Sequence, residues 1–392
     1  MTWTQRWDTS MMRNYGRPPL LLVRGEGARV WDDEGSEYID LLAGIAVNSL
    51  GHGHPTLVAA VTEQLSTLGH TSNLYATEPG LRLAERLLEL SDAPAGSRVF
   101  FCNSGAEANE AAFKLTRLTG RTKVVVAALG FHGRTMGALA LTAQPAKQDP
   151  FRPLPGEVVV VPFGDAEALA NAVDSATAAV VLEPILGESG VIVPPDGYLA
   201  AARAACDRAG ALLVLDEVQT GIGRTGTWFA FQESGIRPDV MTLAKGLAGG
   251  LPIGALVAFG RAADLFTPGS HGSTFGGNPV SAGAALAVIE VIEREGLLAR
   301  VAEVSDLLRA GIPEASQGLV QQVRGRGLLL AAELEGVSSA DLHASLTAHG
   351  LLTNAVTPDA IRLAPPLVLT DDDVAEVLVR WARACEAVAA RA

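Results

Sequence analysis

Leu213-Val-Leu-Asp216-Glu217-Val-Gln219 is an apolar run that ends in two acids. A second apolar run, 239–243, leads into Ala244-Lys245-Gly246 and places Lys245 29 residues after Asp216. Continuous apolar runs of this length are typical of parallel strands that are buried on both faces, and open α/β sheets bind ligands at the carboxyl ends of such strands. The two runs therefore predict strands that bring a carboxylate and an amine to one ligand.

Similar runs occur upstream and are separated by candidate helices. They span residues 98–102, 123–128, 157–161 and 178–182. Residues 196–210 predict one crossover helix, which Gly210 ends as its C-cap. The pattern predicts an α/β fold with a mostly parallel sheet that is covered by helices on both faces.

The pattern changes after about residue 280. Long helical stretches at 280–295 and 297–310 precede a β-like run at 327–334 and a last helix from Asp371. This predicts a smaller α+β unit, which the first 50 residues, with strand-like runs at 30–32 and 38–41, are expected to join. The expected division is an N-terminal segment of the small domain (1–50), a large ligand-binding domain (51–280) and a C-terminal small domain (281–392).

Composition narrows the class of protein. The 392 residues carry a net charge of −13, which disfavours nucleic acid as a partner because nucleic-acid binding needs a basic footprint. No apolar run approaches the roughly 18 residues that span a bilayer, and the N-terminus lacks the apolar region of a secretory signal. Three scattered cysteines predict a reducing compartment, so we expect a cytoplasmic protein with no membrane partner.

The chemistry of Asp216 and Lys245 depends on what lies around them. Alone, such an Asp is most often a turn cap and such a Lys a solvated surface residue, but a carboxylate can also pair with a heteroaromatic nitrogen and a lysine can form an imine with an aldehyde. Residues 220–226, 238–239 and 249–255 add the patterns Thr-Gly-x-Gly-Arg-Thr-Gly, Pro-Asp and Gly-x-Pro-Ile-Gly-Ala. This combination resembles the signature of class III (subgroup II) aminotransferases, and the resemblance extends through essentially the whole chain.

The resemblance implies an enzyme of the fold-type I (aspartate-aminotransferase-like) transferases that depends on pyridoxal 5′-phosphate (PLP), with a large mostly parallel sheet domain and a smaller α+β domain. Lys245 is expected to hold the cofactor as a Schiff base and to act as the catalytic base and acid. Asp216 is expected to pair with the ring nitrogen and Gln219 to bond near the phenolic oxygen. Phe131, in Gly130-Phe-His-Gly-Arg-Thr135, is expected to stack on the ring, although a lone Phe is more often a core residue.

A phosphate site is expected at the start of a helix. Asn103-Ser-Gly-Ala-Glu107 follows a predicted strand, and Ser104 and Glu107 have capping-box spacing. A helix N-terminus with small residues favours an anion, although a plain capped helix explains the spacing equally well. The resemblance places the phosphate on Ser104, Gly105 and Ala106, with Thr274 reaching across from a second subunit. It thereby implies a homodimer, and it places Ser273 close to the substrate.

Two arginines and one glutamate are expected to bind substrate. A guanidinium suits a carboxylate through two parallel hydrogen bonds. The resemblance assigns this role to Arg134 and Arg362, and it makes Glu188 the acid that neutralises Arg362 while an ω-amine substrate is bound. The chain departs from the commoner family pattern at Leu186, where Gln is usual, and at Ser189, where Gly is usual, but neither position carries the charge of the switch.

Two other motifs resemble ligand-binding sites. Gly221-x-Gly223-x-x-Gly226 matches a dinucleotide fingerprint, but it leads into Thr-Trp-Phe-Ala-Phe and no suitable acid follows, which disfavours a nicotinamide oxidoreductase. His52-Gly-His54 lacks a third ligand at plausible spacing, so we expect a turn before a helix and no metal.

Within class III, the motifs Gly44-Ile-Ala-Val-Asn48 and Thr71-Ser-Asn-Leu-Tyr75 resemble most the acetylornithine aminotransferase group, especially its actinobacterial members. Ile45 stands where free-ornithine transaminases have Tyr, and an apolar residue there suits an acylated α-nitrogen. The substrates implied are N2-acetylornithine and 2-oxoglutarate, in arginine biosynthesis. The alternatives are an enzyme for 4-aminobutyrate (whose transaminases also have Ile there), ornithine or N-succinyl-diaminopimelate, or a non-catalytic PLP-binding regulator.

Overall fold

The computed structural model describes residues 1–390, and its largest sheet has seven strands in the order β4-β10-β9-β8-β7-β5-β6. The strands are β4 (Arg98–Cys102), β5 (Lys123–Ala127), β6 (Glu157–Val161), β7 (Thr177–Leu182), β8 (Leu212–Asp216), β9 (Val240–Leu243) and β10 (Gly254–Ala258). Within this sheet β10 alone opposes its neighbours, because it pairs antiparallel with β9 and β4 while the others run parallel. The mostly parallel sheet is confirmed, and β10 was not among the predicted strands.

Both faces of the sheet are covered, as the alternation of side chains along β8 shows. Leu213 and Leu215 belong to one apolar cluster, together with Cys206 of α9 (Tyr198–Ala209). Leu212 and Val214 point the other way into a second cluster, which includes the side chains of α5 (Gly105–Arg117). A strand buried on both faces needs no polar alternation, which explains its continuous apolar sequence.

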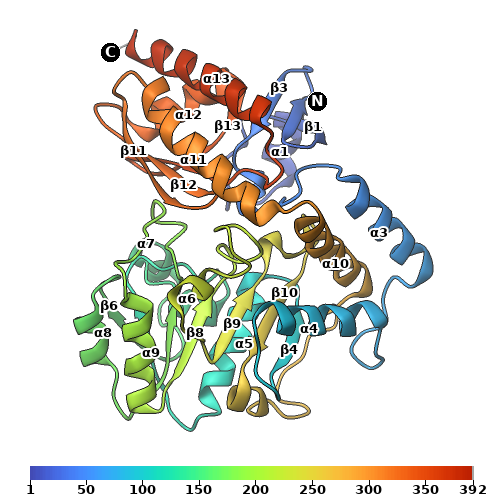
Figure 1. Cartoon of the computed structure of the whole chain (residues 1–392), viewed down its shortest axis with the longest axis vertical. Helices are drawn as coiled ribbons and strands as arrows, with labels where there is room; N and C mark the ends of the chain where they lie inside the picture. Colours follow the sequence, from blue (N-terminus) through green and yellow to red (C-terminus); the bar gives the residue numbers. More distant parts are fainter. Residues whose placement is uncertain (391–392) are drawn as a thin grey trace.

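Helices surround this sheet (Figure 1). They are α3 (Pro55–Thr67), α4 (Glu78–Leu90), α5, α6 (Met136–Leu141), α7 (Pro145–Gln148), α8 (Ala166–Ala172), α9 and α10 (Pro279–Arg294), with short 3-10 turns η1 (Asp149–Phe151), η2 (Ala230–Ser234), η3 (Lys245–Ala248) and η4 (Gly260–Asp264). The predicted crossover helix is α9, and Gly210 follows it with a φ of +65°, a left-handed C-cap that glycine adopts without strain. Within residues 1–390, no helix combines the length and apolarity needed to cross a bilayer.

Two smaller sheets lie together at the other end of the molecule (Figure 1). One has the order β1-β2-β3-β13 and the other β11-β12-β15-β14. Their strands are β1 (Leu22–Glu26), β2 (Arg29–Asp32), β3 (Glu37–Asp40), β11 (Val320–Arg326), β12 (Leu329–Leu334), β13 (Leu351–Leu352), β14 (Asn354–Thr357) and β15 (Ala360–Leu363); the helices here are α1 (Trp3–Ser10), α2 (Ala43–Ala46), α11 (Leu297–Ala315), α12 (Ser339–Ala348) and α13 (Asp371–Ala389). Helix α11 continues five residues beyond the predicted 310.

The N-terminal strands share a sheet with a strand from the C-terminal part of the chain. Strand β3 pairs in parallel with β13, with Ile39 opposite Leu351. This pairing supports our proposal that residues 1–50 and 281–392 form one small domain, while the boundaries themselves stay a prediction. The last predicted helix is α13, which begins at Asp371 after the capping residue Thr370.

The small unit should depend on the burial of Trp381 in α13. Its side chain is fully buried, and its indole N–H donates to Ser316 Oγ at 2.8 Å. We expect Trp381→Ala to destabilise the protein by about 3–5 kcal/mol, because it removes a large core side chain and leaves a cavity. Thermal denaturation should show a clearly lower midpoint. Val379→Ala on the same helix is the control, because Val379 is 52% exposed and should change the midpoint little. Equal midpoints for the two variants would contradict this account of the core.

Candidate active site

A cavity of about 400 Å³ opens at the carboxyl ends of β8 and β9. Its lining includes eight of the twelve residues that the sequence predicted, which are Ser104, Gly105, Ala106, Phe131, Arg134, Asp216, Gln219 and Lys245. They come from four segments that are distant in the sequence. The cavity therefore brings the predicted lysine and carboxylate together at the sheet edge where α/β folds bind ligands.

Lys245 follows β9 and begins the short turn η3. Its φ of +40° lies in the left-handed region that a residue with a side chain rarely adopts. Such strain is kept where the surrounding structure overdetermines the backbone, and it concentrates at functional sites. Burial lowers the pKa of the Lys245 ammonium to about 8, although the charge of Glu188 opposes this shift. About a tenth of the amine is therefore neutral at pH 7, whereas an ordinary lysine with a pKa near 10.4 is almost entirely charged there.

Asp216 is a buried carboxylate that is surrounded by donors. Its Oδ2 accepts hydrogen bonds from Asn109 Nδ2 at 2.7 Å and from His132 Nδ1 at 2.8 Å, and its Oδ1 accepts from the backbone N–H of Val218 at 3.0 Å. Burial opposes the charged form of His132, but the hydrogen bond to Asp216 and the negative charges of Asp216 and Glu183 together outweigh burial and raise the pKa of the imidazole. These donors favour the ionised carboxylate that a protonated heteroaromatic nitrogen requires.

Asn109 and His132 were not among the predicted site residues. Asn109 also accepts a hydrogen bond from the Thr242 hydroxyl on β9 at 2.9 Å, so it links the lysine-bearing strand to the acid-bearing strand. His132 lies inside the motif quoted for Phe131, but nothing in its spacing pointed to Asp216. The signal that could have found it is its position next to a predicted site residue.

The start of α5 has the features of an anion site. Ser104 is its N-cap, and the Ser104 hydroxyl accepts from the backbone N–H of Glu107 at 3.2 Å. The backbone N–H groups of the first turn have no partner within the helix and favour an anion. A Cβ on Gly105 would stand 2.7 Å from the Val218 side chain, so only glycine fits there.

Only one of the two hydrogen bonds of the predicted capping box is present, the one that Ser104 accepts from Glu107. Glu107 does not return its carboxylate to the backbone of Ser104. It accepts instead from Asn103, from the backbone N–H at 2.6 Å and the side-chain amide at 2.9 Å. Asn103 offers two donors one residue earlier, and together they hold the carboxylate better than a single backbone N–H can.

Phe131 lines the cavity and is not a core residue. Its backbone N–H donates to Glu183 Oε1 at 2.8 Å, and Glu183 Oε2 accepts from the backbone N–H of Gly187 at 3.2 Å. Burial raises the pKa of Glu183 to about 7. Glu183 was not among the predicted site residues, although it lies five residues before Glu188. It ties the loop of Phe131 to the loop of Glu188.

Arg362 and Glu188 form an ion pair beside the cavity. Arg362 Nη1, on β15, lies 2.6 Å from Glu188 Oε1 and 3.3 Å from Gln219 Oε1, while Nη2 donates to Asn354 Oδ1 at 2.9 Å. Burial raises the pKa of Glu188, but the positive charges of Arg362 and Lys245 outweigh it and lower that pKa overall. Neither partner lines the cavity, but Gln219 does and contacts Arg362. The ion pair therefore contacts the cavity indirectly, through Gln219.

Ser273 and Thr274, like Glu188 and Arg362, do not line this cavity in the single chain. Ser273 Oγ accepts from Asn103 Nδ2 at 3.1 Å, which places it next to the phosphate end. Thr274 is exposed, and the exposed fraction of the Phe275 side chain that follows is 61%. The expected phosphate contact of Thr274 was assigned across a subunit boundary, so one chain does not test it.

The two rejected motifs have structural roles. The 221–226 glycine segment leads through turns to the short η2, and a Cβ on Gly223 would stand 3.1 Å from the Leu298 side chain. His52 Nε2 lies 2.9 Å from Asp40 Oδ2, and His54 immediately precedes α3. The segment around His52 and His54 is therefore the predicted turn before a helix.

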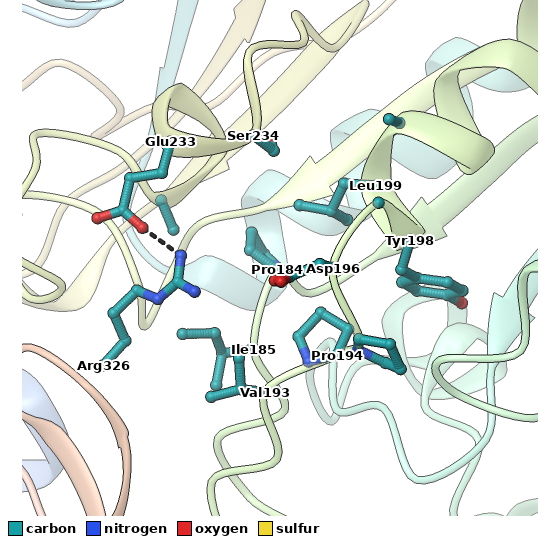
Figure 2. A pocket seen from close by; sticks show the side chains of 14 residues that line it. Pro184, Ile185, Val193, Pro194, Asp196, Tyr198, Leu199, Glu233, Ser234 and Arg326 are labelled. Atoms are coloured by element: carbon teal, nitrogen blue, oxygen red, sulfur yellow. Dashed lines mark hydrogen bonds and ion pairs between the residues drawn. The ribbon is translucent and has the colours of Figure 1, made fainter.

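A second cavity, of about 310 Å³, lies behind the Glu183–Glu188 loop. Figure 2 shows apolar side chains such as Pro184, Ile185 and Val193 around it, with the ion pair of Glu233 and Arg326 at one side. No lysine is among its lining residues, and the unpaired acid there, Asp196, has no amine to act with. The cavity that contains Lys245 and Asp216 is therefore the candidate active site.

Comparison with known proteins identifies the class. The family model Aminotransferase class-III matches residues 10–385, and the chain belongs to that family. Curated relatives are the acetylornithine aminotransferase of Mycobacterium tuberculosis, 64% identical over 94% of this chain and 92% of that protein, and that of Streptomyces coelicolor, 59% identical over 95% and 92%.

Solved structures agree with this assignment. The N-acetylornithine aminotransferase from Stenotrophomonas maltophilia has a TM-score of 0.85 and 40% identity, covering 98% of this chain and 100% of that one. The ornithine aminotransferase from Toxoplasma gondii has a TM-score of 0.94 and 32% identity, covering 99% and 95%. The protein is a PLP-dependent aminotransferase of fold type I, which confirms the expected fold, enzyme class and cofactor.

The residues present fit this cofactor. The cavity offers an anion site at the start of α5, a buried carboxylate for the ring nitrogen and an amine for the aldehyde.

The low pKa of Lys245 can be measured in the cofactor-free chain. An ordinary lysine titrates near 10.4, and burial lowers the pKa of Lys245 to about 8. Because only the neutral amine is nucleophilic, acylation of Lys245 should rise with pH through about 8 and level off above it. Competitive acylation read by mass spectrometry, with exposed Lys114 as internal reference, gives the midpoint. A midpoint at 10 or above would contradict the burial of this amine.

Proposed function

We propose that this aminotransferase moves the δ-amino group of N2-acetylornithine to 2-oxoglutarate, giving N-acetylglutamate 5-semialdehyde and glutamate, as a step of arginine biosynthesis. The observation that carries the proposal is the 54–64% identity, over at least 94% of the chain, to actinobacterial proteins named acetylornithine aminotransferase. The ion pair of Glu188 and Arg362 supports a site that accepts two different substrates in turn.

The cofactor contacts follow from the lining of the cavity. When bound, PLP supplies an aldehyde that takes up the amino group and a pyridine ring that withdraws electrons. Asp216 would hold the ring nitrogen, Phe131 would cover one face of the ring, and Gln219 would bond near the phenolic oxygen. Ser104, Gly105 and Ala106 would hold the phosphate.

Lys245 anchors the cofactor and moves the proton. Its amine is buried, and its pKa of about 8 places it close to working pH, where a group serves best as both base and acid. With PLP bound, Lys245 would hold the cofactor through its aldehyde, and its amine would be the base that takes a proton from the Cδ of the donor and the acid that returns it. Asn109 and His132 donate hydrogen bonds to Asp216 and so hold its carboxylate in position for the ring nitrogen.

Glu188 and Arg362 let one pocket take two substrates. With the pair closed at 2.6 Å, Arg362 is neutralised and an ω-amine chain meets no free cation near Lys245. When 2-oxoglutarate enters, its α-carboxylate replaces Glu188 on the guanidinium, which two parallel hydrogen bonds favour. Arg134 binds the remote carboxylate of either substrate, and ping-pong kinetics follow from the shared pocket.

The role of Ile45 stays a prediction. It lies in α2, a left-handed turn with φ of +66° at Ile45, and its side chain is 40% exposed and outside the cavity lining of this chain. Val47, from the same segment, does line the cavity and is also apolar. An apolar wall at this point suits an acylated nitrogen better than a charged ammonium, which would be desolvated there without a partner.

The partner implied is a second copy of this chain. Large apolar side chains are exposed at 72% for Tyr75, 84% for Leu74 and 61% for Phe275, next to Thr274. A homodimer would cover these side chains and bring Thr274 to the phosphate of the other subunit. The acidic net charge of −13 fits neither nucleic acid nor an anionic membrane as a partner, and we propose the cytoplasm as the location.

A panel of amine donors tests the proposed substrate. With 2-oxoglutarate as acceptor, kcat/KM should be highest for N2-acetylornithine and at least about tenfold lower for ornithine, 4-aminobutyrate and N-succinyl-diaminopimelate, since a pocket discriminates a missing or mispaired polar group by this factor or more. Donor consumption and glutamate formation give the rates. An equal or higher value for another donor would replace the proposed substrate, and no turnover with any donor would favour a non-catalytic regulator.

A further inference from the structure

Lys147 is a cation at the edge of the active site that the proposed mechanism does not use. It lies on α7, and its ammonium is 5.3 Å from the centre of the Phe131 ring. The guanidinium carbon of Arg134 lies 5.6 Å from the centre of the same ring. Phe131 and Arg134 both line the cavity, so Lys147 adds a second positive charge beside the ring that covers the cofactor site.

Lys147 forms no ion pair with an acidic side chain of the described residues. Among the ion pairs of residues 1–390, none involves Lys147 or Arg134, and the side-chain hydrogen bond of Lys147 goes to the neutral Gln144 amide. Glu188 is the acid whose charge acts on Lys147, and it already pairs with Arg362 at 2.6 Å. Burial, and then the charge of Arg134, lower the pKa of Lys147 against that pull.

Two cations near one aromatic ring repel each other unless an anion joins them. A half-buried ammonium also loses part of its hydration. A ligand carboxylate between the two cations would offset both their mutual repulsion and this lost hydration. The two groups differ in shape, because a guanidinium binds a carboxylate as a planar fork whereas an ammonium is a compact point charge that can approach the same carboxylate from another side.

We propose that Lys147 joins Arg134 in binding the substrate carboxylate that is remote from the reacting amine. This inference rests on the proposed function, in which four carbons separate the α-carboxylate of the donor from its δ-amine. Lys147 then determines specificity, because it favours donors with that carboxylate over amines that lack it. The same pair binds the remote carboxylate of glutamate in the second half-reaction.

The competing explanation is that Lys147 lays its aliphatic stem along Phe131 and holds the ring in place. A packing role would affect all donors alike. An electrostatic role would affect only donors with the carboxylate, and it would survive replacement by another cation.

The experiment therefore uses two donors and three variants. N2-acetylornithine is compared with N-acetyl-1,4-diaminobutane, which is the same molecule without the carboxylate. The variants are Lys147→Met, which keeps the stem and removes the charge, and Lys147→Arg, which keeps the charge. The control is Arg152→Gln, which removes one charge from exposed Arg152; this residue donates to Asp149 and Gln148 and does not line the cavity.

Lys147→Met should raise KM for N2-acetylornithine about tenfold with kcat little changed, the loss expected for one charge-assisted contact. It should leave kcat/KM for N-acetyl-1,4-diaminobutane unchanged. Lys147→Arg should retain most of the affinity, and Arg152→Gln should match the unmodified protein. An equal loss on both donors, or no loss on N2-acetylornithine, would overturn the proposal.

Failure of this inference can be told from failure of the proposed function. Turnover of N2-acetylornithine by the unmodified protein tests the function first. If another ω-amine proves to be the donor, glutamate still carries two carboxylates, and its KM in the reverse half-reaction tests Lys147 independently. An unchanged KM for glutamate in Lys147→Met would then overturn the carboxylate site.

Discussion

The buried carboxylate of Asp216 is the constraint on which the rest of the site depends. A carboxylate that is 4% exposed stays ionised only if donors surround it, and Asn109, His132 and the backbone of Val218 supply them. These donors come from α5, from the loop after β5 and from the residues after β8. The hydrogen bonds to Asp216 therefore form only when the sheet, α5 and these loops are folded together.

The same network connects the cofactor end to the substrate end. Asn109 bonds to Thr242, which lies on β9 three residues before the strained Lys245. Glu183 holds the loop of Phe131 and the loop of Glu188 by their backbone N–H groups. Because Glu183 is bonded to both loops, a displacement of one loop would displace the other. The buried Glu183 therefore fixes the position of Phe131 relative to Glu188.

Strands, helices and the main site residues were predictable because their signals are local. Strands β5, β7, β8 and β9 were predicted from their continuous apolar sequences, and Lys245 and Asp216 from their positions at the ends of such runs. Strand β10 was missed because it begins in a glycine-rich segment that is typical of a loop. His132 and Asn109 are 84 and 107 residues from Asp216, and no local pattern encodes such contacts. Lys147 was missed for the same reason, since its charge matters only beside Phe131 and Arg134.

The most direct measurement is reduction of the purified, PLP-loaded protein with borohydride, followed by peptide mapping. Reduction makes the covalent link between the cofactor and its lysine permanent, so the modified peptide identifies the anchoring residue. The account predicts a single adduct on Lys245, at the carboxyl end of β9. An adduct on another lysine, such as Lys147, or the absence of any adduct would contradict the convergence of Lys245 and Asp216 on one cofactor.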